Sequence, residues 1–266
     1  MKKAIATIAI AGAATAASAD FLSDLSIAGT FDYESSYIYR GAKLAQASFQ
    51  PSVDFGYSVL GGDLYAGVWT NQPISGGANE IDFYTGYAYP VTDIFTVDAG
   101  FTYYWYPEAF GAGAINQTRE IFIGASADVL LSPAVYVYYD FDLEQTVVEF
   151  SIGYSLDLGE YVGTEGLSFD TGAYLGILNA NSYNAGMNAP KLGNGYTYGG
   201  ITADLVYAFN ENVSSSVGVR WSVNNDGDSQ TGGVNPATGN FYGVGPANLA
   251  GAESQIWFGA TLGFAY

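Results

Sequence analysis

The sequence predicts an all-β protein, a closed antiparallel up-and-down transmembrane β-barrel of about twelve strands. Three observations lead to this prediction. Residues 256–266, at the end of the chain, carry an apolar or aromatic side chain at every second position. The first 19 residues have the pattern expected of a secretory leader, and no run of about 18 apolar residues follows them, which excludes helical membrane spans. Tyr, Phe and Gly are abundant, at 23, 16 and 35 residues, and this composition favours strands over helices.

The terminal stretch predicts the closing strand of the barrel. A side-chain period of two indicates an extended strand with one apolar face. Pairing this strand with the first one would close the sheet and remove both of its edges. The pattern resembles the last strand of bacterial outer-membrane barrels, which the barrel assembly machinery of that membrane recognises. The resemblance implies an assembly signal at Phe258, Leu262, Phe264 and Tyr266.

The amino terminus predicts export. Lys2 and Lys3 precede a short apolar run over residues 4–14, and Ala17-Ser18-Ala19 is a leader-peptidase cleavage pattern. We therefore predict a signal peptide at residues 1–19 and one outer-membrane barrel domain at residues 20–266. The expected location is the cell outer membrane, with its lipid as the surrounding partner.

Alternating segments predict the strands in order. The first six are 24–34, 48–57, 63–71, 80–89, 94–105 and 120–128. Apolar side chains such as Phe95, Val97 and Phe101 alternate in each of them, although the facing of 63–71 is ambiguous. The second six are 134–142, 146–158, 167–178, 197–209, 213–223 and 256–266. Each is close to the length of about 9–11 residues that a tilted strand needs to cross a bilayer.

The connections predict the orientation. Those after even-numbered strands are mostly short, as at Pro90–Asp93 and Asn210–Asn212. Those after odd-numbered strands are mostly long and rich in Gly, Asn and Ser, with a short exception at 143–145. The long ones are 37–47, 72–79, 106–119, 179–195 and 224–254. Short periplasmic turns and long extracellular loops are typical of outer-membrane barrels.

The side chains that alternate with the apolar face predict an acidic lumen. They include nine carboxylates and a single base, Arg220. The acids are Asp32, Glu34, Asp54, Asp82, Asp98, Asp140, Glu149, Asp170 and Asp204. Nine ionised carboxylates cannot occupy a dry interior, because each costs several kcal/mol to desolvate unpaired. We therefore expect a narrow, water-containing bore, and carboxylate rings favour cations. The alternative is a plugged lumen in which these acids accept hydrogen bonds from Tyr and Ser.

Several classes of function are disfavoured. The chain has no histidine and no cysteine, which excludes a Ser-His-Asp or Cys-His nucleophile and leaves no zinc ligand cluster. We expect no catalytic residue, no metal and no cofactor. With 26 acidic against 7 basic side chains and a net charge of −19, no basic surface exists for nucleic acid.

The first hairpin and the middle strands also resemble a known family. The segments that carry the resemblance are Tyr39–Gly41, Gln50–Tyr57, Leu64–Trp69, Glu80–Tyr87, Phe101–Pro107 and Val135–Asp140. They resemble the TorF-type porin family of outer-membrane proteins over most of residues 31–158. The resemblance implies an outer-membrane diffusion channel. Arg40 could orient the first loop over the mouth, or it could pair with a neighbouring carboxylate.

Two functions follow from these patterns. The first is a porin-like channel for passive diffusion of small hydrophilic solutes, with a preference for cations. The second is a non-conducting structural or surface-binding barrel that acts through its long extracellular loops. A soluble exported β-sandwich is a third possibility for the fold, because its core would also bury alternating aromatic side chains.

Overall fold

The computed structural model describes residues 25–74, 77, 79–108, 116–180, 195–225, 240–241, 245–246 and 254–266. The predicted signal peptide at 1–19 lies outside the described residues. So do half of the residues in the predicted loop 106–119 and most of those in the predicted loops 179–195 and 224–254. No helix within the described ranges is long and apolar enough to span a membrane.

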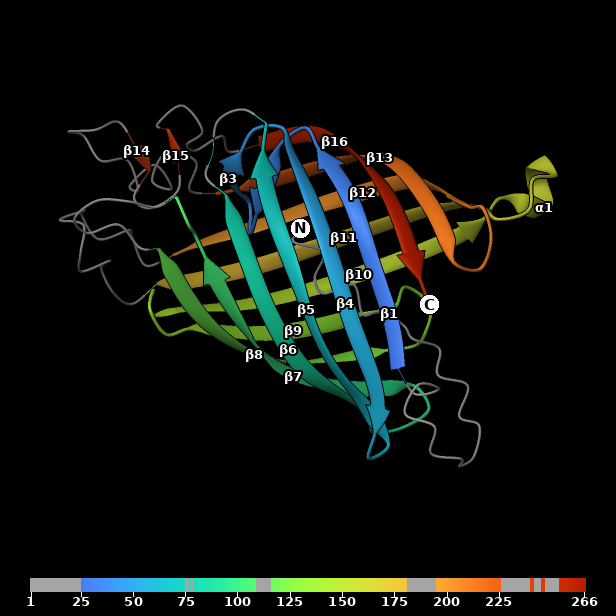
Figure 1. Cartoon of the computed structure of the whole chain (residues 1–266), viewed down its shortest axis with the longest axis horizontal. Coiled ribbons are helices and arrows are strands. Elements are labelled where there is room, and N and C mark those ends of the chain that lie inside the picture. The colour runs from blue at the N-terminus through green and yellow to red at the C-terminus, as the bar shows by residue number, and fades with distance from the viewer. Residues whose placement is uncertain are drawn as a thin grey trace.

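Twelve antiparallel strands close into one barrel, which confirms the predicted fold class (Figure 1). Around the barrel their order is β1-β16-β13-β12-β11-β10-β9-β8-β7-β6-β5-β4. Apart from the closing pair β1 and β16, strands that are neighbours in the barrel are also consecutive barrel strands in the chain. This is the up-and-down arrangement. The strands are β1 Leu25–Glu34, β4 Ser48–Val59, β5 Gly62–Pro73, β6 Glu80–Pro90, β7 Phe95–Trp105, β8 Gln117–Ala127, β9 Ala134–Asp140, β10 Gln145–Asp157, β11 Leu167–Ala180, β12 Tyr196–Ala208, β13 Val213–Asn224 and β16 Ser254–Ala265.

The first and last strands form the seam of the barrel. β1 pairs with β16 in a register that places Phe31 opposite Leu262 and Gly29 opposite Phe264. Tyr266 extends the pairing, because its N–H and its C=O both hydrogen-bond to Ile27. The terminal stretch therefore leaves no open edge, as its alternating pattern predicts.

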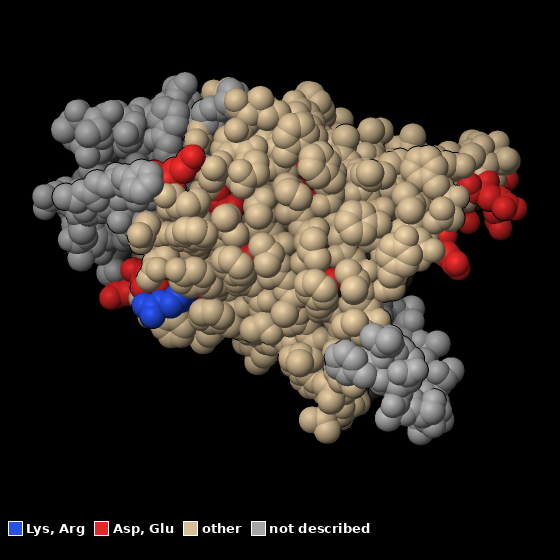
Figure 2. Space-filling model, viewed as in Figure 1, with Lys and Arg blue, Asp and Glu red and all other residues tan. Residues whose placement is uncertain are grey.

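The outward face of the barrel is apolar. Phe31, Phe101 and Val217 are 50%, 36% and 59% exposed, although each sits in the middle of a strand. On the side shown in Figure 2, exposed charged side chains gather mostly towards the two ends of the barrel. A soluble sandwich would bury these aromatic and aliphatic side chains between two sheets, so the closed barrel excludes that alternative.

Short turns join the strands at one end. Leu60 and Gly61 join β4 to β5 with φ of 54° and 81°, the two positive values that a type I′ hairpin turn requires. The connection between β10 and β11 holds one short helix, α1 Gly159–Val162, which ends at Gly163 in the left-handed conformation. A further short pair, β14 Asn240–Phe241 with β15 Gly245–Pro246, lies in the long connection before β16.

The first connection differs from the predicted extracellular loop. Residues 37–47 contain a hairpin, β2 Tyr37–Tyr39 and β3 Ala42–Ala45, that folds into the barrel. Tyr37, Ile38 and Ala45 are at most 3% exposed. The sequence prediction was wrong here because the hairpin is stabilised by side chains from strands far along the chain. A buried cluster of Val147, Tyr174, Leu178 and Tyr198 lies on the wall that surrounds it.

Candidate functional site

The predicted acidic residues lie on the inner side of the barrel wall, or at its ends, with different degrees of burial. Asp32, Asp82, Asp98 and Asp140 are between 2% and 7% exposed, and Arg220 is 9% exposed. The remaining five acids are half-buried: Glu34, Asp54, Glu149, Asp170 and Asp204. On the terminal strand, Phe258, Leu262, Phe264 and Tyr266 point outwards and are 56%, 48%, 40% and 78% exposed.

Hydroxyl groups donate hydrogen bonds to most of these carboxylates. Tyr198 donates to Glu149 at 2.6 Å, and both Tyr65 and Tyr136 donate to Asp98 at 2.9–3.1 Å. Asp32, Asp54 and Asp170 are held in the same way, with donors Thr30 and Thr261, Tyr84, and Ser155 and Ser168 respectively. The predicted hydrogen bonds from Tyr and Ser to these acids are therefore present in the barrel wall. A neutral hydroxyl orients a carboxylate without cancelling its charge.

Glycine on the inner face explains how the tyrosine rings fit. A side chain added at Gly67 would have its Cβ 2.5 Å from the ring of Tyr84, and at Gly176 2.2 Å from the ring of Tyr198. Each ring lies across a neighbouring strand at a position without a side chain, an arrangement that also protects the glycine backbone. The rings lie along the wall, and this leaves space in the bore.

Asp140 is also held by the turn that follows its strand. Its carboxylate accepts hydrogen bonds from the backbone N–H groups of Asp142 and Leu143 at 2.9 and 2.8 Å. It therefore closes the turn between β9 and β10, a structural role that an Asp at a turn commonly has.

The predicted base and two of the predicted acids form one cluster. Arg220 Nε lies 3.2 Å from Glu34 Oε1, and Arg220 Nη2 lies 2.9 Å from Asp204 Oδ1. These residues line a small cavity of about 120 Å³ together with Tyr37 of the inward hairpin. Arg220 thus neutralises part of the charge of Glu34 and Asp204 at the wall.

Two acids and one base in the bore were missed by the sequence prediction. Glu80 and Glu120 are each 1% exposed. They precede the outward-facing Ile81 and Ile121, so the same alternation that selected Asp82 could have identified them. Arg40 is a second guanidinium in the bore, in addition to Arg220, the one base predicted on the inner face of the strands. Arg40 lies in the inward hairpin, where no strand period indicates its direction.

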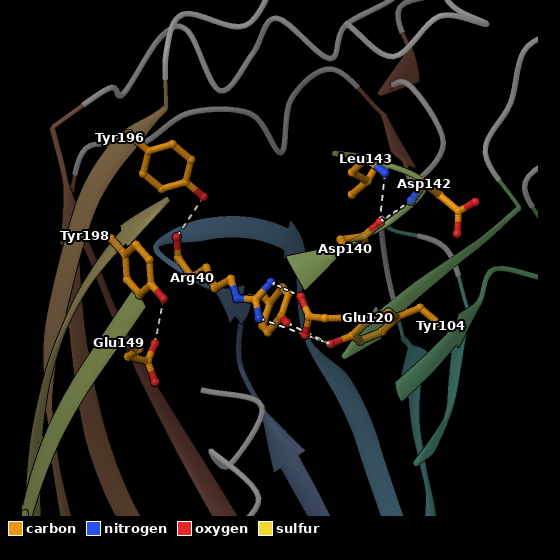
Figure 3. A network of polar contacts seen from close by, with 10 residues as sticks. Arg40, Tyr104, Glu120, Asp140, Asp142, Leu143, Glu149, Tyr196 and Tyr198 are labelled. Carbon is orange, nitrogen blue, oxygen red and sulfur yellow. Dashed lines mark hydrogen bonds and ion pairs between the residues drawn. The ribbon is translucent and has the colours of Figure 1, made fainter. Parts of the chain in front are cut away.

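Arg40 binds the opposite wall from the tip of the inward hairpin (Figure 3). Its Nη1 and Nη2 donate to the two oxygens of Glu120 at 2.7 and 2.9 Å, a bidentate ion pair. The rings of Tyr39 and Tyr138 each have their centroid 4.7 Å from Arg40 Cζ. Of the two roles considered for Arg40, pairing with a carboxylate is the one that the structure shows.

The hairpin is also held on its other side. Tyr196 Oη donates to the backbone oxygen of Arg40 at 2.9 Å, and Asn224 Nδ2 donates to that of Gly41 at 2.8 Å. Contacts with β8 and β9 on one side and with β12 and β13 on the other show that the hairpin crosses the bore. It narrows the bore towards the end where the long connections leave the strands.

A larger cavity of about 440 Å³ continues from the hairpin to the short turn at Asn210–Asn212. Four of the predicted acids line it: Asp32, Asp54, Asp82 and Glu149. Arg40 and Glu120 line it as well, together with aromatic rings that include Trp69, Tyr84 and Tyr174. Asp98, Asp140 and Asp170 lie outside the lining of both cavities. The structure therefore brings some of the predicted acids together in one chamber and leaves others in the wall.

Solved structures are similar to this chain at low sequence identity. A KdgM porin in complex with disordered oligogalacturonate matches with a TM-score of 0.50 and 12% identity, over 91% of this chain and 99% of that one. LpxR from Salmonella typhimurium matches with a TM-score of 0.48 and 8% identity, over 90% and 99% of the two chains. An outer membrane channel from Pseudomonas putida F1 matches with a TM-score of 0.47 and 7% identity, over 95% and 100%. At these identities the similarity to the porin concerns the fold alone.

Sequence comparison places the chain in a family. No curated protein matches it. A family model described as bacterial protein of unknown function (Gcw_chp) matches residues 16–165, more than half of the chain. The matched region contains β1 to β10 and the inward hairpin with Arg40. The chain belongs to the Gcw_chp family of bacterial proteins.

Proposed function

We propose that this protein is a porin-like outer-membrane channel for passive diffusion of small hydrophilic solutes, with a preference for cations. The observation that carries the proposal is the chamber of about 440 Å³ inside a closed barrel, lined by Asp32, Asp54, Asp82 and Glu149. The apolar outer face supports a location in lipid. There, a β-sheet can satisfy the backbone N–H and C=O groups of every strand only by closing into a barrel. The resemblance to TorF-type porins supports the same function, and the absence of histidine and cysteine supports a non-enzymatic one.

The charge of the chamber supports the cation preference. Arg40 is paired with Glu120, which leaves five other acids, the four named above and Glu211 at the short turn, in excess over the bases on the lining. Rings of carboxylates attract cations and repel anions from a narrow aqueous path. Such an excess would be unfavourable in a dry core, so water or cations would compensate it.

Export and assembly complete the proposal. The signal peptide at residues 1–19 would direct the chain out of the cytoplasm, and the barrel assembly machinery would read Phe258, Leu262, Phe264 and Tyr266. These outward-facing side chains lie on β16, which forms the seam with β1. The barrel cannot close without this strand.

The test is conductance in planar bilayers with a salt gradient across the membrane. We expect single channels whose reversal potential shows cation preference. The variants Asp82→Asn and Glu149→Gln should reduce that preference, because each removes a charge from the chamber lining. Asp128→Asn, an exposed residue outside the lining, should leave it unchanged. Anion preference, or no conductance in any preparation, would contradict the proposal.

The inward hairpin favours a second candidate function. Because β2 and β3 occupy part of the bore, the barrel could be non-conducting and could act through its extracellular connections. The longest of these is 224–254, most of which lies outside the described residues. Silent bilayers, together with loss of a surface interaction after deletion of residues 226–253, would support this function over the first.

A further inference from the structure

We infer that the larger cavity binds small organic cations, in which an ammonium or guanidinium group is attached to a short hydrocarbon chain. The inference deepens the proposed channel function by naming a class of solute, and it relies on that function for its biological meaning. Binding itself can be measured without conduction, so the two proposals can fail separately.

Arg40 shows the chemistry that the bore uses to hold an organic cation. Its guanidinium makes two hydrogen bonds to Glu120 and lies over the rings of Tyr39 and Tyr138, whose centroids are each 4.7 Å from Cζ. A bidentate carboxylate and nearby aromatic rings satisfy both the charge and the apolar surface of such a group. The hairpin therefore places a tethered guanidinium at the end of the cavity.

The same types of side chain continue along the cavity beyond Arg40. Asp54 accepts a hydrogen bond from Tyr84, and the carboxylate of Asp82 and the indole of Trp69 line the same chamber. Glu149 and Tyr174 also line it. Carboxylates and aromatic rings thus both line the cavity that the tethered guanidinium adjoins.

The size and the lining of the cavity define the class of ligand. A volume of about 440 Å³ lies within the range of about 300–1,000 Å³ that is usual for small-molecule sites. Aromatic rings offer a bare inorganic ion little compensation for its lost water, whereas a hydrocarbon chain gains from burial against them. Carboxylates disfavour anions, and a neutral chain would leave their charge without a counter-ion.

The experiment uses purified, folded full-length protein in detergent and isothermal titration calorimetry. The probe is agmatine, which carries an amine and a guanidinium on a four-carbon chain. Hexanediol and adipate, a neutral and an anionic molecule of similar length, are the comparison ligands. We expect saturable binding of agmatine and no detectable binding of the other two. Addition of agmatine should also change the fluorescence of Trp69, and Trp69→Phe should remove that change.

Three variants locate the site. Asp54→Asn and Glu149→Gln remove charges from the cavity lining, and each should weaken agmatine binding by about tenfold, the effect of losing one charge-assisted contact. Asp170→Asn is the matched control. Asp170 is also a half-buried acid held by hydroxyl donors, but it does not line the cavity. It should bind agmatine as the wild type does.

Each outcome decides the inference. Equal binding of hexanediol, binding of adipate, or an equal loss in Asp170→Asn would overturn it, because the site would then not require a local carboxylate. If the protein conducts ions but does not bind agmatine, the channel proposal stands and this inference fails. If it binds agmatine but does not conduct, the cavity is a binding site in a closed barrel and the channel proposal fails.

Discussion

Arg40 combines an unusual backbone with a buried charge. Its φ of 49° and that of Gly41 at 76° form the two-residue turn between β2 and β3. Few non-glycine residues adopt this conformation, which costs on the order of 1–3 kcal/mol and persists where the surroundings hold it. The surroundings here are Glu120, which is 1% exposed, and the hydrogen bonds from Tyr196 and Asn224. The ion pair and these hydrogen bonds therefore hold the strained turn in place.

At this scale we predict the effect of removing the guanidinium. Arg40→Ala leaves the buried carboxylate of Glu120 without its ion-pair partner, and we expect the free energy of unfolding to fall by about 3–5 kcal/mol. Urea unfolding of the barrel in lipid vesicles would measure the loss. Arg40→Ala combined with Glu120→Gln should recover part of it, since no uncompensated charge then remains. A double variant no more stable than Arg40→Ala would show that the charge is unimportant.

The exposed ion pair between Arg119 and Asp142 is the matched control. Arg119 Nη2 lies 2.7 Å from Asp142 Oδ1, but the side chain of Arg119 is 51% exposed. The hydrogen bond from Arg119 holds the pKa of Asp142 below its ordinary value. Stabilisation of this sign is present above the pKa of the unfolded chain and is lost as the pH falls through the lowered pKa. Solvent screens the pair, so we expect no measurable loss of stability in Arg119→Ala.

Among the elements, the sequence identifies the barrel strands and misses the inward hairpin. The strand predicted at 80–89 is β6 Glu80–Pro90, and the one predicted at 213–223 is β13 Val213–Asn224. Their period of two is a local signal, so the sequence alone shows it. The hairpin depends on contacts of Arg40 with Glu120 and Tyr196, which lie 80 and 156 positions further along the chain. No local pattern contains that information.

At the scale of this element we predict that the hairpin limits conductance. Replacing residues 35–47 with a short turn should join β1 to β4 directly, because Glu34 already pairs with Ser48. The single-channel conductance should rise, on the order of severalfold, because the hairpin then no longer narrows the bore. A twelve-strand barrel without a plug is wider than an eight-strand barrel that its own side chains fill. Planar bilayer recording would measure the change. An unchanged conductance would show that solutes pass outside the region that the hairpin fills.

The whole molecule depends on the seam between β1 and β16. Every other neighbouring pair in the barrel comes from consecutive barrel strands, whereas this pair joins the two ends of the described chain. Closure therefore needs the last strand to be complete, which explains the alternation up to Tyr266. The outward side chains of this strand do not contribute to the seam hydrogen bonds, so their role can be separated from the fold.

Tyr266 allows that separation. Its side chain is 78% exposed, and its hydrogen bonds to Ile27 are made by the backbone and remain in Tyr266→Ala. We expect the stability of the refolded barrel to change by no more than about 0.5 kcal/mol, as is usual for exposed positions. If the barrel assembly machinery reads the terminal ring, the amount of folded protein in the outer membrane should nevertheless fall clearly. Tyr161→Ala, which removes a ring that is 75% exposed on α1, is the matched control and should assemble normally. Normal assembly of Tyr266→Ala would show that the terminal ring is not part of an assembly signal.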